Sequence, residues 1–397
     1  MIELEEFRAL LTPAGQAALD EAIARQPRER DFLAHYQALQ RKYPPSLARA
    51  GLEVAILRQE ARDKFPFADR LYFNRQALEQ ASSYEVAAYR AQRFLGFSHL
   101  ADLGCSVGGD TLAMAVIAPT IGIDIDPLRL AMAQANLASL GLGERAAFVL
   151  ADLTSPLPLA ALPTPERLGL FFDPARRSKG RRIFSVEAYH PPLSSIQNWQ
   201  KRFPAIGVKL SPGVNLAELA GYSAEVEFIS LRGGLKEAVM WCGSLKSCGR
   251  RATLLPGAYT LSVDSDVSVP KLPIDQPQAY IYEPDPAVLR AGLVGCLGEQ
   301  LGATQMDADI AYLSSEHLIF SPFARAWAVE DWFPFGLKKL RSYLQARQVG
   351  TVIVKKRGSP LEPEELIRLL RLRGDAQRTI FLTHLRGKAI VLITQEV

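Results

Sequence analysis

One stretch of this chain limits its fold more than any other, because it joins a buried strand, a glycine turn and a helix to an acid at a fixed distance. Residues 99–103 are apolar apart from Asp102, as expected of a buried parallel strand. Gly104 and Gly108 follow, and residues 109–117 have the pattern of a helix. A second strand, 119–124, ends in Asp124. This order is typical of α/β folds that hold the ribose of an adenine cofactor.

Two further acids indicate which adenine cofactor fits. Asp102 lies inside the strand before the glycines, where a carboxylate repels a pyrophosphate but attracts an ammonium and a sulfonium. Asp152 follows a third expected strand, 147–151, and can accept a hydrogen bond from an adenine amine. We therefore predict S-adenosylmethionine as the cofactor, with a dinucleotide as the alternative.

Composition indicates a globular protein with more than one domain. The chain has 397 residues, of which 48% are hydrophobic and 22% charged. It has no apolar run of about 18 residues, and its acidic first residues do not resemble a signal peptide. The four cysteines lack the spacing of metal ligands. We expect a cytoplasmic protein without a bound metal or a membrane span, and the sequence does not indicate its oligomeric state.

The pattern of elements predicts four segments along the chain: a helical region at 1–97, an S-adenosylmethionine-binding domain at 98–245, a linker or β-excursion at 246–278 and an α+β domain at 279–397. In the second segment strands alternate with helices, which predicts a Rossmann-like, seven-stranded α/β sheet. Its last two strands are expected to form an antiparallel hairpin at the edge. The C-terminal segment, with a helix expected at 286–301, has a split βαβ pattern of the ferredoxin-like kind.

A second group of candidate residues closes the fourth expected strand, 168–172. Asp173 and Pro174 follow it, where a carboxylate and a carbonyl can accept hydrogen bonds from a substrate amine. The alternative is a helix start with proline in its first position. Lys209 ends the next strand and either steadies the substrate or pairs with Asp173. His190, on the loop between these strands, is a candidate for substrate contact rather than a base, because amine methylation needs no strong base.

Basic residues point to a polyanionic partner. Five cations stand within seven residues beside Asp173, a pattern suited to phosphate contact: Arg176, Arg177, Lys179, Arg181 and Arg182. Residues 336–397 carry 13 Lys or Arg and 5 Asp or Glu, a balance of +8, while the whole chain has +4. The remainder is therefore at −4, so the C-terminal region is the basic part. A merely solvated basic surface is the alternative.

Residues 98–175 resemble class I S-adenosylmethionine-dependent methyltransferases. Residues 105–111 and 122–127, with Asn136, resemble the RNA-modifying branch that includes trimethylguanosine synthase, and the whole chain is similar to bacterial proteins with a C-terminal THUMP-like domain. True THUMP domains help to bind tRNA. The resemblance implies that Asp173 and Pro174 form the catalytic motif, and we add Lys209 as a catalytic candidate because it ends the neighbouring strand. It also implies that Asp102, Gly104 and Gly108 line the methionine end of the cofactor, that Asp124 holds the ribose and that Asp152 meets the adenine. We expect their neighbours Cys105, Ser106, Ile125 and Leu153 to line the same site.

Two departures from the family pattern affect these expectations. Ser106 replaces a middle glycine, which we expect to be tolerated if its φ is negative. Ala175 and Arg176 follow Pro174, where amine methyltransferases have a second proline and an aromatic that stacks on the base. An arginine plane or Phe172 is a candidate replacement for that ring.

These observations support an enzyme that methylates a base nitrogen of tRNA or rRNA. The first alternative is a methyltransferase for a protein or small molecule, in which the cations recognise an acidic substrate. The second is a non-catalytic RNA-binding or assembly factor with a degenerate methyltransferase domain. The three retained acids argue against the second alternative, and cofactor binding separates it from the others.

Overall fold

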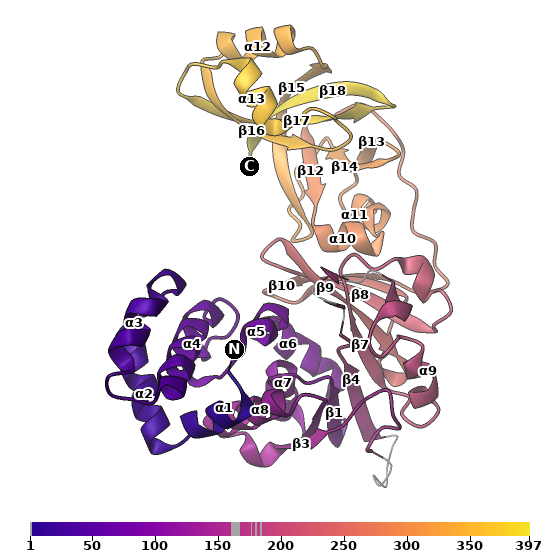
Figure 1. The fold of residues 1–397 in the computed structure, drawn as a ribbon. Coiled ribbons are helices and arrows are strands. Elements are labelled where there is room, and N and C mark those ends of the chain that lie inside the picture. Colours follow the sequence, from indigo (N-terminus) through magenta and orange to yellow (C-terminus); the bar gives the residue numbers. More distant parts are fainter. Residues whose placement is uncertain (1, 160–166, 176, 179–180, 183–184) are drawn as a thin grey trace. The chain divides into compact units, whose positions relative to one another are not determined.

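The computed structural model describes residues 2–159, 167–175, 177–178, 181–182 and 185–397. Contacts divide the chain into two units, which are described separately (Figure 1). The first contains Met1–Val226 and Lys236–Ser247. The second contains Glu227–Leu235 and Cys248–Val397.

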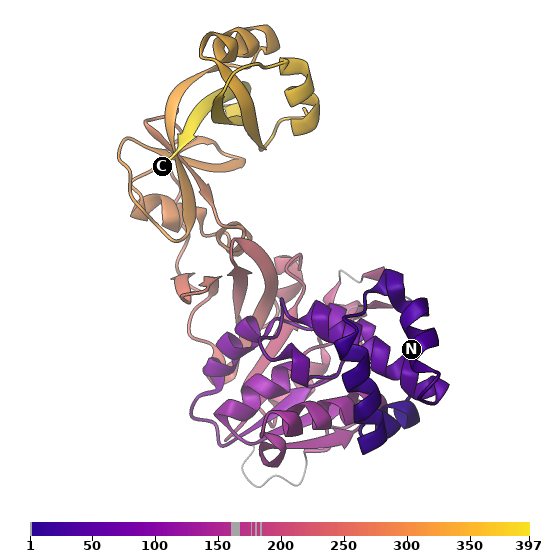
Figure 2. The same cartoon turned by 90° about the vertical axis from the view of Figure 1, so that its left-hand side faces the viewer.

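Helices form the N-terminal part of the first unit, as predicted. Proline occupies the first turn of two of them, where its missing N–H costs no hydrogen bond. Their apolar side chains share a core with those of α7 (Gly109–Ile117) and α8 (Pro127–Ser139), two helices of the α/β domain described next (Figure 2). The helices are α1 (Leu4–Leu10), α2 (Pro13–Ala24), α3 (Phe32–Leu39), α4 (Pro45–Ala61), α5 (Arg75–Gln80) and α6 (Tyr84–Ala91).

The predicted doubly wound sheet makes up most of the rest of the first unit, although residues 227–235, which belong to its β8 and β9 hairpin, are part of the second unit. Its strands run in the order β8-β9-β7-β4-β1-β2-β3, and the pairs β7/β4, β4/β1, β1/β2 and β2/β3 are parallel. The helices α7 and α8 lie on one face and α9 on the other (Figure 1). The elements are β1 (His99–Leu103), α7 (Gly109–Ile117), β2 (Thr120–Asp124), α8 (Pro127–Ser139), β3 (Ala146–Leu150), β4 (Leu168–Phe172), α9 (Ser195–Gln200), β7 (Ile206–Leu210), β8 (Ala224–Leu231) and β9 (Gly234–Cys242).

This topology brings the carboxyl ends of five strands to one edge. Because β1, β2, β3, β4 and β7 are parallel, the residues that follow them gather where open α/β sheets bind their ligands. The expected helix at 214–220 is only the 3-10 turn Leu216–Leu219. The expected hairpin is β8 and β9, but it does not end the sheet: β10 pairs with β8 and β11 with β10, so the sheet has nine strands instead of the expected seven.

The second unit contains a seven-stranded sheet with strand order β13-β14-β12-β15-β18-β17-β16. Leu340 and Leu344 of α12 and Leu366 and Leu370 of α13 pack into a core with β16, β17 and β18. The elements are β10 (Arg250–Leu255), β11 (Tyr259–Val263), β12 (Tyr280–Pro284), α10 (Pro286–Ala291), α11 (Val294–Gln300), β13 (Thr304–Asp307), β14 (Ile310–Ser315), β15 (Ala324–Pro334), α12 (Leu337–Ala346), β16 (Val349–Lys356), α13 (Pro363–Leu370), β17 (Ala376–Leu385) and β18 (Lys388–Glu396).

Two features of this unit correct the sequence-based expectations. The single helix expected at 286–301 is two helices, because Gly292 adopts a left-handed φ of +66° and ends α10. The hairpin of β13 and β14 was not expected. The α+β class is confirmed.

Candidate active site

The loop after β1 has the backbone conformation that the glycines predict. Gly104 and Gly108 have φ of +85° and +82°. A Cβ at Gly104 would lie 2.6 Å from the carbonyl oxygen of Asp173, so only glycine fits there. Ser106 also has a positive φ, +51°, and the expectation of a negative φ is wrong. A non-glycine residue held in this region marks local strain, which is common where a loop contacts a ligand.

Three backbone amides of the loop donate hydrogen bonds to acceptors at the end of β2. The amides of Gly104 and Cys105 both donate to the Ile123 carbonyl, at 2.8 and 3.0 Å. The Ser106 amide donates to Asp124 Oδ2 at 2.8 Å. Cys105 itself is buried, and burial raises the pKa of its thiol, so its side chain is unsuited to act as a nucleophile.

Asp102 is buried, and one of its two carboxylate oxygens has no hydrogen-bond partner among the described residues. Its Oδ2 accepts a hydrogen bond from the Thr111 hydroxyl at 2.6 Å, whereas Oδ1 has no hydrogen-bond partner among the described residues. Burial and the neighbouring Asp110 raise the pKa of Asp102 to about 8. A buried carboxylate oxygen without a partner is costly, and an ammonium group from a ligand would satisfy it. This fits the amino acid end of S-adenosylmethionine.

The end of β2 offers a carboxylate beside apolar surface. Asp124 accepts one backbone hydrogen bond on each oxygen, from Ser106 and Asp126, which leaves further lone pairs for hydroxyl groups. Ile125 follows it and is 62% exposed, and Leu150, paired with Asp124 across β2 and β3, is 59% exposed. Two exposed apolar side chains at the ends of adjacent strands suit a flat apolar ring such as adenine.

Asp152 lies just beyond β3 and is half-buried. Its Oδ1 accepts hydrogen bonds from the amide and the hydroxyl of Thr154, both at 2.8 Å. These bonds lower the pKa of the Asp152 carboxyl, and His190 lowers it further. The carboxylate is therefore kept charged. Leu153 next to it is buried.

Asp173 and Lys209 form an ion pair at the adjacent strand ends. The Asp173 amide donates to the carbonyl of Leu103, which places Asp173 beside the glycine-containing loop that follows β1. Lys209 Nζ donates to Asp173 Oδ2 at 2.7 Å, and the lysine side chain is only 4% exposed against 24% for the aspartate. Of the two roles considered for Lys209, the structure shows pairing with Asp173. Pro174 is buried.

The cations after Pro174 are only partly described. Arg176 and Lys179 lie outside the described residues, and the backbones of Arg177, Arg181 and Arg182 form the short antiparallel pair β5 (Arg177–Ser178) and β6 (Arg181–Arg182). Phe172 is fully buried and packs edge-on against Trp199, with ring centroids 4.9 Å apart. It therefore cannot stack on a substrate base, and that candidate role is wrong.

Sequence reasoning missed a buried arginine under this site. Arg90 of α6 pairs with Asp110 at the start of α7 and with Glu237 of β9, 2.8 Å away in the second case. Its guanidinium also lies 4.6 Å from the Phe171 ring centroid. Asp110 and Glu237 lie on elements far apart in the sequence, so the spacing of residues along the chain does not predict this cluster.

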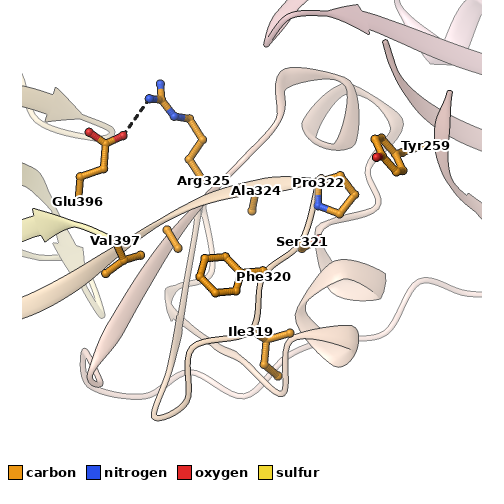
Figure 3. A pocket seen from close by; sticks show the side chains of 10 residues that line it. Tyr259, Ile319, Phe320, Ser321, Pro322, Ala324, Arg325, Glu396 and Val397 are labelled. Carbon is orange, nitrogen blue, oxygen red and sulfur yellow. Dashed lines mark hydrogen bonds and ion pairs between the residues drawn. The ribbon is translucent and has the colours of Figure 1, made fainter. Parts of the chain in front are cut away.

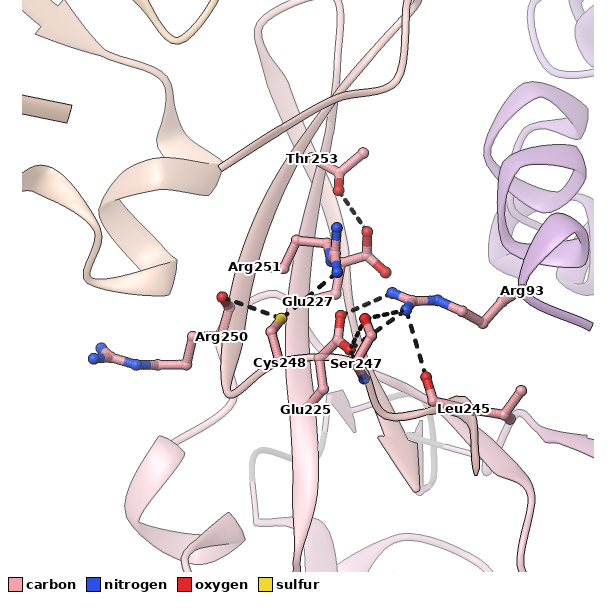
Figure 4. A network of polar contacts seen from close by, with 9 residues as sticks. All are labelled: Arg93, Glu225, Glu227, Leu245, Ser247, Cys248, Arg250, Arg251 and Thr253. Carbon is pink, nitrogen blue, oxygen red and sulfur yellow. Dashed lines mark hydrogen bonds and ion pairs between the residues drawn. The ribbon is translucent and has the colours of Figure 1, made fainter. Parts of the chain in front are cut away.

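Other polar and hollow regions are formed by residues that are not among the predicted site residues. The second unit has a hollow of about 460 Å³ lined by Tyr259, Phe320, Arg325 and Glu396, among others (Figure 3). Figure 4 shows two buried acids of β8: Glu225 pairs with Arg93 in the first unit at 2.8 Å, and Glu227 accepts from Thr253 in the second unit. Both acids have polar partners of their own, so their role is structural.

Two other kinds of site are absent from the described part of the chain. No helix there combines the length and the apolar composition that crossing a membrane requires. The described residues also contain no group of three or more His, Cys, Asp or Glu side chains placed to hold a metal ion.

Comparison with known proteins identifies the chain's relatives. The family of THUMP-like domains matches residues 324–396, and a family of unknown function matches residues 3–61. Two uncharacterized S-adenosylmethionine-dependent methyltransferases of Mycobacterium tuberculosis, from strains CDC 1551 and H37Rv, are each 34% identical over 354 residues, which is 86% of this chain and 94% of theirs. The crystal structure of a candidate methyltransferase of Porphyromonas gingivalis W83 matches with a TM-score of 0.76 at 22% identity, over 94% of this chain and 99% of that one. The chain belongs to the family of S-adenosylmethionine-dependent methyltransferases that includes these mycobacterial proteins.

Proposed function

We propose that this methyltransferase modifies a base nitrogen of tRNA or rRNA, at the carboxyl end of β4. The observation that carries the proposal is the Asp173 carboxylate, which is fixed by Lys209 and lies beside the cofactor loop. A carboxylate in this place can accept a hydrogen bond from an exocyclic or ring N–H and orient the nitrogen lone pair. The methyl donor supplies a carbon bonded to a positively charged sulfur, so the protein needs mainly to position the nitrogen.

We assign the cofactor site to the residues that gather around the ends of β1, β2 and β3. Asp102 would receive the ammonium on its unpartnered oxygen, and Asp124 would receive the ribose hydroxyls. Asp152 would accept from the adenine amine, between the apolar side chains that flank that edge. The remaining members contribute loop backbone or neighbouring surface: Gly104, Cys105, Ser106, Gly108, Ile125 and Leu153.

Charge and domain content support RNA as the substrate. The THUMP-like match lies in the C-terminal region, whose residues 336–397 have a balance of +8. Such a region attracts phosphates without reading a sequence. The cations 176–182 follow Pro174 directly and would meet phosphates near the target nucleotide.

The test is transfer of labelled methyl from S-adenosylmethionine to unmodified RNA, with Asp173→Ala as the variant. We expect the wild type to label tRNA or rRNA and the variant to lose about a hundredfold or more of that rate, as misplacement of a reacting group does. Asp266→Ala is the matched control, because Asp266 is exposed and lies in the second unit. Cofactor binding but no label in any RNA would exclude the RNA proposal and favour a protein or small molecule.

A further inference from the structure

His190 presents an exposed ring from an unusually well-anchored stretch of backbone. Its amide donates to the Ala175 carbonyl at 3.1 Å, and its carbonyl accepts from the Ala175 amide at 3.0 Å. The residues on either side, Tyr189 and Pro191, are buried, whereas His190 is exposed. The backbone of His190 is thus held in place while its side chain is open to solvent, and binding residues are often found on loops that a scaffold positions in this way.

The anchor places His190 beside the proposed substrate nitrogen. Ala175 directly follows Pro174, so the two backbone hydrogen bonds tie the histidine to the segment that carries Asp173. Residues directly opposite each other in an antiparallel bridge have neighbouring side chains on the same face. His190 also acts electrostatically on Asp152, beyond the end of β3. His190 is therefore tied to the segment that carries Asp173 and is close enough to Asp152 to act on its charge.

A base bound at Asp173 needs contact on its face as well as its edge. Proteins that hold a single extruded base bind its edge by hydrogen bonds and its face by stacking. Phe172 and Tyr189 are both buried and have no free face. Among the described residues of β4 and of the loop 185–191, His190 is the ring left exposed to solvent.

We propose that the His190 imidazole stacks on the ring of the target nucleobase while Asp173 binds its edge. This assignment rests on the proposed RNA methylation and adds the residue that binds the face of the base. His190 is then a substrate-binding residue, and its ring rather than its basicity is what the reaction uses.

The test compares three variants in steady-state methylation of the RNA that the wild type labels. His190→Ala and His190→Asn remove the ring, and we expect the KM for RNA to rise about five- to a hundredfold, the usual range for losing one stacked base. His190→Phe keeps a ring but has no basic nitrogen, and we expect its KM and its pH–rate profile to stay near those of the wild type. His99→Ala is the matched control, because His99 is exposed at the amino end of β1, at the opposite edge of the sheet.

Each result bears on one claim. If His190→Phe is as impaired as His190→Ala, or if His190→Ala leaves the KM for RNA unchanged, the stacking role is wrong and RNA methylation still stands. If the wild type labels no RNA, both proposals fail together. Titration with S-adenosylmethionine checks folding, since every variant that retains its cofactor affinity has kept the first unit intact.

Discussion

At the scale of single residues, the proposed contact between Asp102 and the ammonium of the cofactor predicts that cofactor binding depends on pH. Burial and Asp110 raise the pKa of Asp102 to about 8, so the free protein holds this carboxyl largely protonated near neutrality. A cofactor ammonium binds the charged form, so we expect affinity for S-adenosylmethionine to increase by up to about tenfold per unit as the pH rises toward ~8. Above that pH an α-amino group loses its own proton, so affinity should fall again. Calorimetric titration between about pH 6 and pH 9 measures both limbs.

Asp102→Asn separates the two titrations in that profile. The side-chain amide of asparagine cannot ionise. We therefore expect the variant to bind S-adenosylmethionine weakly, without the rise in affinity toward pH ~8 and with the fall above that pH unchanged. Asp102 should also make the free energy of unfolding of the cofactor-free wild type depend on pH, and this free energy should fall, not rise, as the pH increases. Because the folded pKa of Asp102 exceeds the unfolded one, its contribution to stability is full below pH ~4 and is lost as pH rises to ~8. An acidic limb that persists in Asp102→Asn would assign the titration to another group.

At the scale of elements, Arg90 holds α6, α7 and β9 together. Its side chain is 2% exposed and faces both Asp110 and Glu237. Arg90→Met would leave two carboxylates without their buried cation, and we expect a loss of about 3–5 kcal/mol in the free energy of unfolding. Urea denaturation at about pH 8 measures this loss.

At acid pH, the loss in the free energy of unfolding caused by Arg90→Met should be smaller. Burial raises the pKa of Glu237, so the variant can protonate this group as pH falls and remove the unpaired charge. We expect the difference between Arg90→Met and the wild type to be smaller at acid pH than at neutral pH. Glu237→Gln is the matched control: it keeps Arg90 paired with Asp110, so its loss should be smaller. Equal losses at both pH values would show that packing of the arginine, rather than its charge, matters.

Some helices and strands could be predicted from the sequence, and others could not. The β1–α7–β2 unit was predictable because its glycines, its acids and its hydrophobic runs lie within 26 residues, 99–124. The break at Gly292 was not, since a glycine inside an apolar helical pattern leaves open whether the helix continues. The pairing of Arg90 with Glu237 and the bridge between Ala175 and His190 depend on tertiary contacts that no spacing encodes. The site was therefore predictable where it is made of strand ends, and not where loops or buried ion pairs complete it.

At the scale of the whole molecule, the uneven charge predicts that the proposed RNA binding can be weakened without changing cofactor binding. The +8 of residues 336–397 includes exposed cations on and after the two C-terminal helices, among them Lys338 and Arg373. We expect the double variant Lys338→Glu/Arg373→Glu to weaken RNA binding and to reduce the slope of log K against log salt by roughly 1 for each phosphate that the variant no longer binds. Cofactor affinity should not change, because its proposed residues all belong to the first unit.

The matched control for that experiment is Arg28→Glu/Arg30→Glu, which alters two exposed arginines in the N-terminal helical region of the first unit. It makes the same change in net charge, so a general electrostatic effect would weaken RNA binding equally in both proteins. A loss confined to the C-terminal variant would instead assign the phosphate contacts to the THUMP-like region. The Asp173 site would then be served by two separable interactions: phosphates bind by charge in the second unit, and a single base is selected by shape and hydrogen bonding in the first.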